Sequence, residues 1–174
     1  MMQDWSPEER LLLTNLDSLF DDAAIRARID VIAAGVEAKL NGNPDAVLAW
    51  ETVPLETYGQ PLDDSVKSSW VFILRAGTST GAERHPNSIQ RVMSYRRSGD
   101  FRVMDDGRQW TSHVLSSDRL GPIDERWVSI PELTWHEPVV TGEHWIVVSF
   151  HTVAAEELIE ERPDSQRVYA QHEI

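Results

Sequence analysis

The chain has 174 residues, a formal net charge of −13 at pH 7 and no cysteine, and 41% of its residues are hydrophobic. These values are typical of one globular domain, argue against nucleic acid or an anionic membrane surface as a partner, and exclude disulfides and thiolate metal sites. No apolar run approaches the roughly 18 residues of a membrane helix, and residues 1–13 lack a signal-peptide pattern. We therefore expect a cytoplasmic protein that acts on a small molecule.

Residues 1–45 are expected to form an N-terminal helical segment. The sequence Ser-Pro-Glu-Glu at residues 6–9 is a capping box that starts the first helix. Apolar residues then recur at helical spacing in two runs, which are Leu12, Leu16, Leu19 and Phe20, and Ile25, Ile29, Ile32, Val36 and Leu40. Asp21 or Asp22 can cap the second helix, and Asn-Gly-Asn-Pro at residues 41–44 ends it. We expect these helices to pack on the rest of the chain or on a neighbouring subunit.

Residues 46–153 are expected to form one β-barrel, because the apolar period changes from 3.6 to two. The predicted strands are Ala46–Val53, Trp70–Arg75, Arg91–Tyr95, Phe101–Met104, Trp127–Ile130 and Trp145–Thr152. Residues 54–69 contain two Pro and one Gly and are predicted to be a loop or hairpin crossing. Residues 154–174 are expected to be an acidic C-terminal tail that begins as a weak helix and ends irregularly.

Two segments carry the candidate chemistry. Glu83 and His85 are two residues apart, so in a strand their side chains share a face. Pro86–Ser88 form a turn, and Gln90 opens the next strand. Some forty residues later, the sequence Pro-Glu-Leu-Thr-Trp-His ends at His136.

These two segments resemble the two signature motifs of the cupin superfamily, over residues 68–153. The first motif runs Gly, five residues, His-x-His, three or four residues, Glu, and later a Gly; the matching residues are Gly77, Glu83, His85, Gln90 and Gly99. The second runs Gly, five residues, Pro-x-Gly, two residues, His, three residues, Asn. This chain keeps Pro131 and His136 and has Glu125, Leu133 and Val140 at the positions of Gly, Gly and Asn. The resemblance implies a mainly β, cupin-type jelly-roll (double-stranded β-helix) barrel, and a homodimer that pairs through barrel edges.

Carried over residue by residue, the resemblance implies that Glu83, His85, Gln90 and His136 hold a divalent metal. Two imidazoles and one carboxylate with open positions suit Fe, Mn, Ni or Zn, and the Gln90 amide would be a weak fourth ligand. Two of the four ligand positions depart from the family pattern. Two alternatives therefore stay open: the four side chains form a metal-free pocket floor, or the ligand pair is instead His85 and Asn87.

Three functions follow from these alternatives. The first is a metal-dependent enzyme, such as a dioxygenase or isomerase of a small organic acid. The second is a metal-independent epimerase, in which His85 or His136 is the general base. The third is a metal-free cupin that senses or carries a small molecule. The sequence assigns no catalytic residue, and a cupin barrel alone does not define a reaction.

Other residues carry weaker expectations. Trp70, Trp127, Trp135 and Trp145 are expected in the barrel core and rim, where aromatic side chains can stack a planar or sugar-like ligand. His144 and His151 flank the last apolar strand, and one of them can face the cavity. Most of a group of four arginines is expected on the outer face, with one able to turn inward and hold a carboxylate or phosphate; these are Arg91, Arg96, Arg97 and Arg102.

Overall fold

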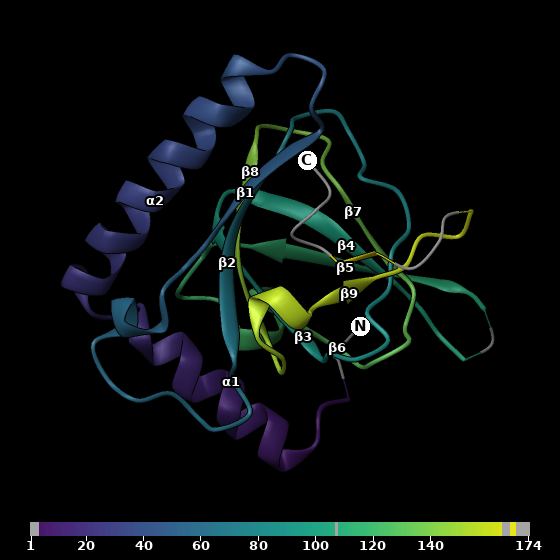
Figure 1. The fold of residues 1–174 in the computed structure, drawn as a ribbon. Helices are drawn as coiled ribbons and strands as arrows, with labels where there is room; N and C mark the ends of the chain where they lie inside the picture. Colours follow the sequence, from purple (N-terminus) through teal and green to yellow (C-terminus); the bar gives the residue numbers. More distant parts are fainter. Residues whose placement is uncertain (1–3, 107, 165–167, 170–174) are drawn as a thin grey trace.

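Two antiparallel sheets form a barrel, and two helices cover one outer face of it (Figure 1). The structure, a computed structural model, describes residues 4–106, 108–164 and 168–169. The larger sheet has the strand order β1-β2-β8-β3-β6, and the smaller has the order β5-β4-β7. This confirms the predicted mainly β jelly roll with N-terminal helices. Within the described residues, no helix has the length and apolar character needed to cross a membrane.

The helices begin where the capping residues predict. Helix α1 spans Pro7–Leu19 and helix α2 spans Ala23–Gly42. Ser6 Oγ accepts a hydrogen bond from the Glu9 amide at 3.1 Å, and Asp22 Oδ1 accepts one from the first turn of α2 at 2.7 Å. Because each cap accepts a backbone N–H that the first turn leaves without a helical partner, the caps fix both starting points.

The strands are β1 (Leu48–Thr52), β2 (Ser68–Leu74), β3 (Gln90–Arg96), β4 (Ser98–Met104), β5 (Trp110–Ser116), β6 (Trp127–Ile130), β7 (His136–Val139), β8 (Trp145–His151), β9 (Ile159–Glu160) and β10 (Val168–Tyr169). The six predicted runs correspond to β1, β2, β3, β4, β6 and β8, whereas β5, β7, β9 and β10 lie outside those runs. The predicted helix at the start of the tail is wrong. Residues 155–157 make only one 3₁₀ turn, and β9 follows and pairs with β10. Most of the last dozen residues, predicted to be irregular, lie outside the described residues.

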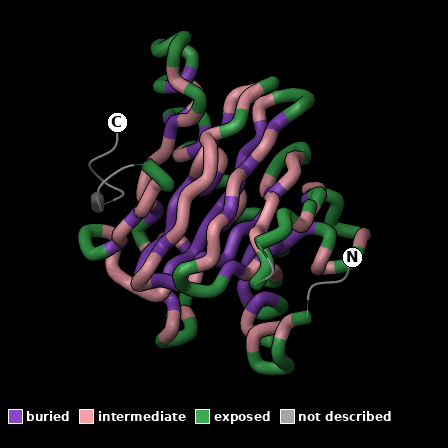
Figure 2. Tube along the Cα trace, turned by 90° about the vertical axis from the view of Figure 1, so that its right-hand side faces the viewer, coloured by how far each residue is buried: buried purple, intermediate pink, exposed green. Residues whose placement is uncertain are grey.

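Alternation along the strands divides the core into two layers. On β8, Ile146, Val148 and Phe150 belong to the cluster shared with the helices, whereas Trp145 and Val147 belong to the cluster inside the barrel. All seven residues of β8 are buried, since the helices cover one face of this strand and the barrel interior lies on the other. Buried residues run along the strands, and exposed ones gather in the loops (Figure 2).

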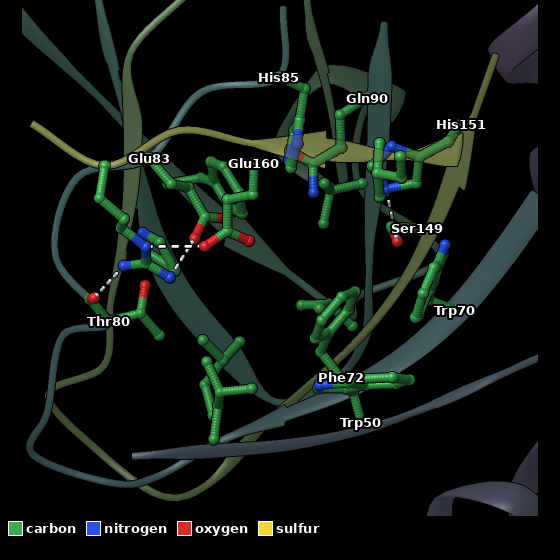
Figure 3. A pocket seen from close by; sticks show the side chains of 18 residues that line it. Trp50, Trp70, Phe72, Thr80, Glu83, His85, Gln90, Ser149, His151 and Glu160 are labelled. Carbon is green, nitrogen blue, oxygen red and sulfur yellow. Dashed lines mark hydrogen bonds and ion pairs between the residues drawn. The ribbon is translucent and has the colours of Figure 1, made fainter. Parts of the chain in front are cut away.

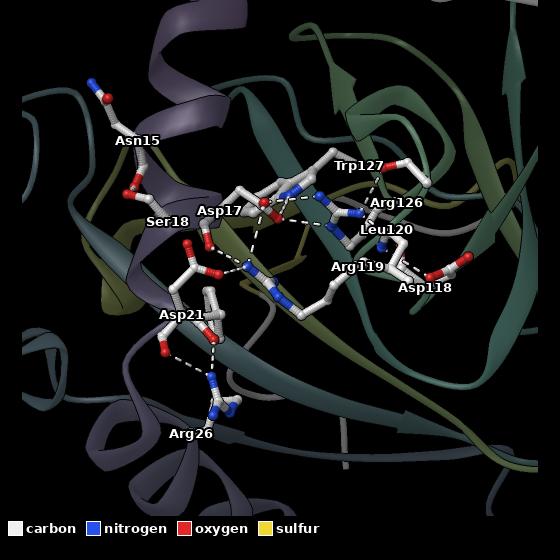
Figure 4. A network of polar contacts seen from close by, with 12 residues as sticks. Asn15, Asp17, Ser18, Asp21, Arg26, Asp118, Arg119, Leu120, Arg126 and Trp127 are labelled. Atoms are coloured by element: carbon white, nitrogen blue, oxygen red, sulfur yellow. Dashed lines mark hydrogen bonds and ion pairs between the residues drawn. The ribbon is translucent and has the colours of Figure 1, made fainter.

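A buried ion pair joins α1 to the start of β6 (Figure 4). Asp17 accepts hydrogen bonds from Arg126 Nε at 2.9 Å and Arg126 Nη2 at 2.8 Å, one on each carboxylate oxygen, and from Trp127 Nε1 at 2.8 Å. Burial raises the pKa of Asp17, but the hydrogen bonds from Arg126 and Trp127 outweigh it, so this pKa is lowered overall. The carboxylate is therefore ionised at neutral pH and helps to hold α1 on the barrel.

None of the four arginines lines the cavity; Arg91 is the buried one, and it pairs with a residue of α1. Its Nε and Nη2 lie 2.7 and 3.0 Å from the two carboxylate oxygens of Glu9 in α1. Ser129 Oγ on β6 donates to the same carboxylate at 2.6 Å. Arg91 therefore anchors α1 to the larger sheet, and it does not line the barrel cavity.

Candidate functional site

The inward-facing side chains of β8 change from apolar to polar along the strand. Trp145 and Val147 pack in the barrel core, and further along the strand Ser149 and His151 line a cavity (Figure 3). Gln90, the cross-strand partner of His151, lines the same cavity. About 70 Å³ of this cavity is accessible to the centre of a water molecule. Since one water needs roughly 10–15 Å³ on this measure, the cavity has room for a small organic molecule.

Backbone pairing brings Glu83 beside His136. The Glu83 N–H donates to the His136 carbonyl, and the His136 N–H donates to the Glu83 carbonyl, both at 2.8 Å. Residues paired in this way project their side chains to the same face at cross-strand distance. His85 follows two residues after Glu83 and shares that face. The candidate ligand atoms of all three residues lie within 4.8 Å of one another.

Both imidazoles have one nitrogen fixed by a backbone carbonyl. His85 Nδ1 lies 3.0 Å from the Ile159 carbonyl oxygen, and His136 Nδ1 lies 2.9 Å from that of Thr134. Because a carbonyl oxygen only accepts, each Nδ1–H is the donor, so the neutral form of each ring has its lone pair on Nε2. Neither Nε2 hydrogen-bonds to another described residue, and His136 Nε2 lies 3.5 Å from Glu83 Oε1. Metal-binding histidines are commonly oriented in this way by the other ring nitrogen.

The pKa shifts of His85 and Glu83 favour the protonation states that metal ligands need. The pKa of His85 is lowered to about 4, mainly by burial and then by the neighbouring His136. Burial raises the pKa of Glu83, but its interaction with the neighbouring His136 and the charges of His85 and Arg162 outweigh this, so the pKa is lowered overall. At neutral pH, His85 is therefore a neutral imidazole and Glu83 an ionised carboxylate.

The four predicted ligand residues lie in one region of the barrel. Glu83, His85 and Gln90 line the cavity, while His136 is fully buried next to Glu83. Gln90 Oε1 is also buried and has no hydrogen-bond partner among the described residues. One carboxylate, two imidazole lone pairs and one amide oxygen are a donor set that first-row divalent metals accept. The residues present therefore fit the metal that the cupin resemblance implies.

Of the two histidines that flank the last strand, His151 is the one that faces the cavity. Its ring centroid lies 5.3 Å from that of His85, and its pKa is lowered well below the ordinary value, chiefly by burial. The alternation of side chains along β8 predicts this orientation of His151. If Trp145 faces inward, residues 147, 149 and 151 lie on the same face. His144 lies outside the cavity and accepts a hydrogen bond from the Ala76 N–H at 3.0 Å.

Two charged residues from the C-terminal segment also reach the cavity, and the sequence did not assign them. Arg162 Nη2 lies 2.9 Å from Glu83 Oε2, and Arg162 Nε lies 2.7 Å from Glu160 Oε1. Arg162 Nη1 donates to the Thr80 carbonyl at 2.6 Å. Arg162 and Glu160 come from around β9, where Glu161 also makes both backbone hydrogen bonds of a bridge with Arg84. A sequence pattern of a few residues does not predict a contact between residues some eighty positions apart, such as Arg162 and Thr80.

We expect the metal-free protein to lose stability between about pH 6.5 and pH 4, in part through His85. Its pKa is about 4 when folded and about 6.5 when unfolded, so protonation favours the unfolded chain in this window. With about 1.4 kcal/mol per pKa unit, this one group accounts for about 3 kcal/mol of the free energy of unfolding. In urea titrations across this range, His85→Gln should show a flatter pH profile than the wild type. Parallel profiles for wild type and His85→Gln would contradict the prediction.

Comparison with known proteins shows similarity at the level of the fold. No family model matches the sequence, and no curated protein matches it. Among solved structures, the coconut allergen cocosin aligns with a TM-score of 0.52 at 14% identity, and pumpkin seed globulin with 0.52 at 15%; each alignment covers 69% of this chain and 29% of the other. The capsular polysaccharide assembling protein CapF from Staphylococcus aureus aligns with 0.51 at 15%, over 66% of this chain and 31% of the other. This chain thus spans about a third of the length of these proteins, and the likeness extends to their fold alone.

Proposed function

We propose, from the cupin fold that these likenesses confirm, that the protein binds a divalent metal through Glu83, His85 and His136 and acts on a small organic acid in the adjoining cavity. One observation carries the proposal: two Nε2 lone pairs and an ionised carboxylate converge within 4.8 Å beside a cavity that admits a small molecule. Gln90 would supply a weak neutral ligand. Fe(II), Mn(II), Ni(II) and Zn(II) are the candidate ions.

The side chains of the site would have separate roles in binding the metal and the substrate. Glu83, His85 and His136 would hold the ion beside the cavity. When bound, a divalent ion supplies Lewis-acid polarisation and orientation of an oxygen-containing substrate. The apolar part of the cavity would exclude water from the reacting groups. A dioxygenase and an isomerase are the two reaction classes that we propose for such a site.

Calorimetric titration of the chelator-treated protein with each of the four ions tests this proposal. We expect saturable binding of one ion per chain for at least one of them, because the imidazoles are already oriented and His85 and Glu83 are in the required protonation state. Binding should release few protons near pH 7, since His85 is already neutral. Absence of binding for all four ions, in a protein that unfolds cooperatively, would refute the proposed function.

A metal-free binding protein is the second candidate, and one contact favours it. The Arg162 guanidinium already pairs with Glu83, 2.9 Å from Oε2, so the carboxylate of the site has a cationic partner without any metal. In this case the polar groups would bind a ligand by hydrogen bonds. The same titration distinguishes the two candidates.

A further inference from the structure

One side of the cavity is aromatic. Trp50, Trp70 and Phe72 come from the neighbouring strands β1 and β2, where Trp50 and Phe72 are cross-strand partners. The rings of Trp50 and Trp70 lie 4.8 Å apart edge to face, and those of Trp70 and Phe72 lie 6.0 Å apart and nearly parallel. We call these three residues the aromatic wall. Its ring faces are apolar and can pack against a planar apolar group of a ligand.

The charged groups lie away from the aromatic wall, whereas the polar side chains of Ser149 and His151 lie beside Trp70. Figure 3 shows Glu83 and Glu160 well away from Trp50 and Phe72. Both carboxylates pair with Arg162, at 2.9 and 2.7 Å. A bound molecule can therefore contact the aromatic wall with one end and the metal-binding residues with the other. With about 70 Å³ accessible to water centres, a single ring with one small substituent is a suitable size.

The charged residues around the cavity determine whether an anionic, neutral or cationic substituent binds most tightly. Among the described residues that line it, Glu83 and Glu160 are carboxylates and Arg162 is a guanidinium, which leaves one net negative charge. The charge of Arg162 is already balanced by its two carboxylate partners, at 2.9 and 2.7 Å, so Arg162 alone does not make the cavity attractive to anions. A divalent ion at Glu83, His85 and His136 would change the balance to one net positive charge.

We infer that the metal-loaded cavity binds a small monocarboxylate with a flat apolar body. The carboxylate lies at the metal end, and the body lies on the aromatic wall. The inference rests on the proposed metal site, because without the ion the described residues that line the cavity carry a net negative charge, which disfavours an anion. A dicarboxylate fits less well, since its second charge would be desolvated against the aromatic wall.

Three planar probes of nearly equal shape test the charge selection: benzoate is an anion, benzamide is neutral and benzamidine is a cation. Each is titrated into Zn(II)-loaded and chelator-treated protein, with affinity read by calorimetry and by quenching of tryptophan fluorescence. In the loaded protein we expect benzoate to bind about 10-fold or more tightly than benzamide, and benzamidine to bind most weakly. In the chelator-treated protein the order should reverse.

Trp50→Leu tests the aromatic wall. Trp50 is only partly buried on the edge strand β1, so this change should preserve the fold, which thermal unfolding checks. We expect benzoate affinity to fall about 5-fold or more, while the affinities for Zn(II) and for acetate, which has no flat body, stay constant. Trp110→Leu is the control, because Trp110 lies on β5 outside the cavity. If Trp50→Leu destabilises the protein, Phe72→Leu repeats the test from the neighbouring strand.

The outcomes separate the two proposals. Failure of Zn(II) and of the other three ions to bind overturns both the proposed function and this inference. Metal binding without a preference for benzoate over benzamide overturns this inference alone. A preference for benzamidine in the loaded protein would identify a cation-binding cavity and also overturn it.

Discussion

His136→Ala should lower the affinity for divalent metal by more than the roughly 10–100-fold that is typical of changes to residues outside the coordination shell. The change removes one of the two Nε2 lone pairs in the cluster and leaves Glu83 and His85 with the weak amide of Gln90. Two strong protein ligands hold a divalent ion poorly. His85→Ala should act in the same direction, because it removes the other oriented lone pair. Metal stoichiometry after reconstitution with each candidate ion, followed by calorimetric titration, measures the loss.

His113→Ala is the matched control for this prediction. His113 lies on β5 outside the cavity, so its removal should leave metal affinity unchanged. Because His136 is fully buried, truncation can also loosen the fold, and His136→Gln provides a second variant that fills more of the space. Equal metal occupancy in wild type, His85→Ala and His136→Ala would show that the three-residue cluster does not hold the ion.

The cupin architecture was predictable because its signals are local. The change in apolar period predicted the helical segment and the start of the strands. The spacing of Glu83, His85 and Gln90 predicted that these residues lie together in the barrel cavity. Leu133 departs from the second cupin motif, which has Gly at this position, but its backbone conformation is one that Gly favours. Leu133 has a φ of 61°, in the left-handed region that favours glycine, at the position where the second cupin motif has Gly. The turn before His136 therefore keeps the backbone shape of the motif although its glycine is missing.

The remaining parts of the site depend on contacts between residues far apart in the chain. Arg162 reaches Glu83 from the C-terminal segment, and Ile159 supplies the carbonyl that fixes the tautomer of His85. The buried pair of Arg91 with Glu9 is of the same kind. Such pairings depend on how the elements pack, and neither periodicity nor motif spacing contains that information. The charge of the cavity, and hence its selectivity, could only be argued from the fold.

Asp17→Asn should be among the most destabilising polar substitutions in this protein. Asp17 balances Arg126, whose side chain is only 6% exposed, and it also accepts the indole hydrogen bond of Trp127. Asn keeps the shape but leaves the guanidinium buried without its counter-charge. Removing one partner of a buried ion pair costs about 3–5 kcal/mol. For a chain of this length, that corresponds to a fall in Tm on the order of 10 °C.

Asp21→Asn is the control, because Asp21 pairs with Arg119 just beyond α1 but its side chain is 71% exposed. Exposed pairs contribute roughly 0–1 kcal/mol, so this variant should unfold close to the wild type. The pKa of Asp17 is lowered in the folded protein, so its stabilisation is complete above the unfolded pKa and is lost as the pH falls through the folded value. The difference between wild type and Asp17→Asn should therefore be full at pH 7 and shrink in strong acid. If the two Asn variants lose similar stability at pH 7, the Asp17 ion pair does not hold α1 on the barrel.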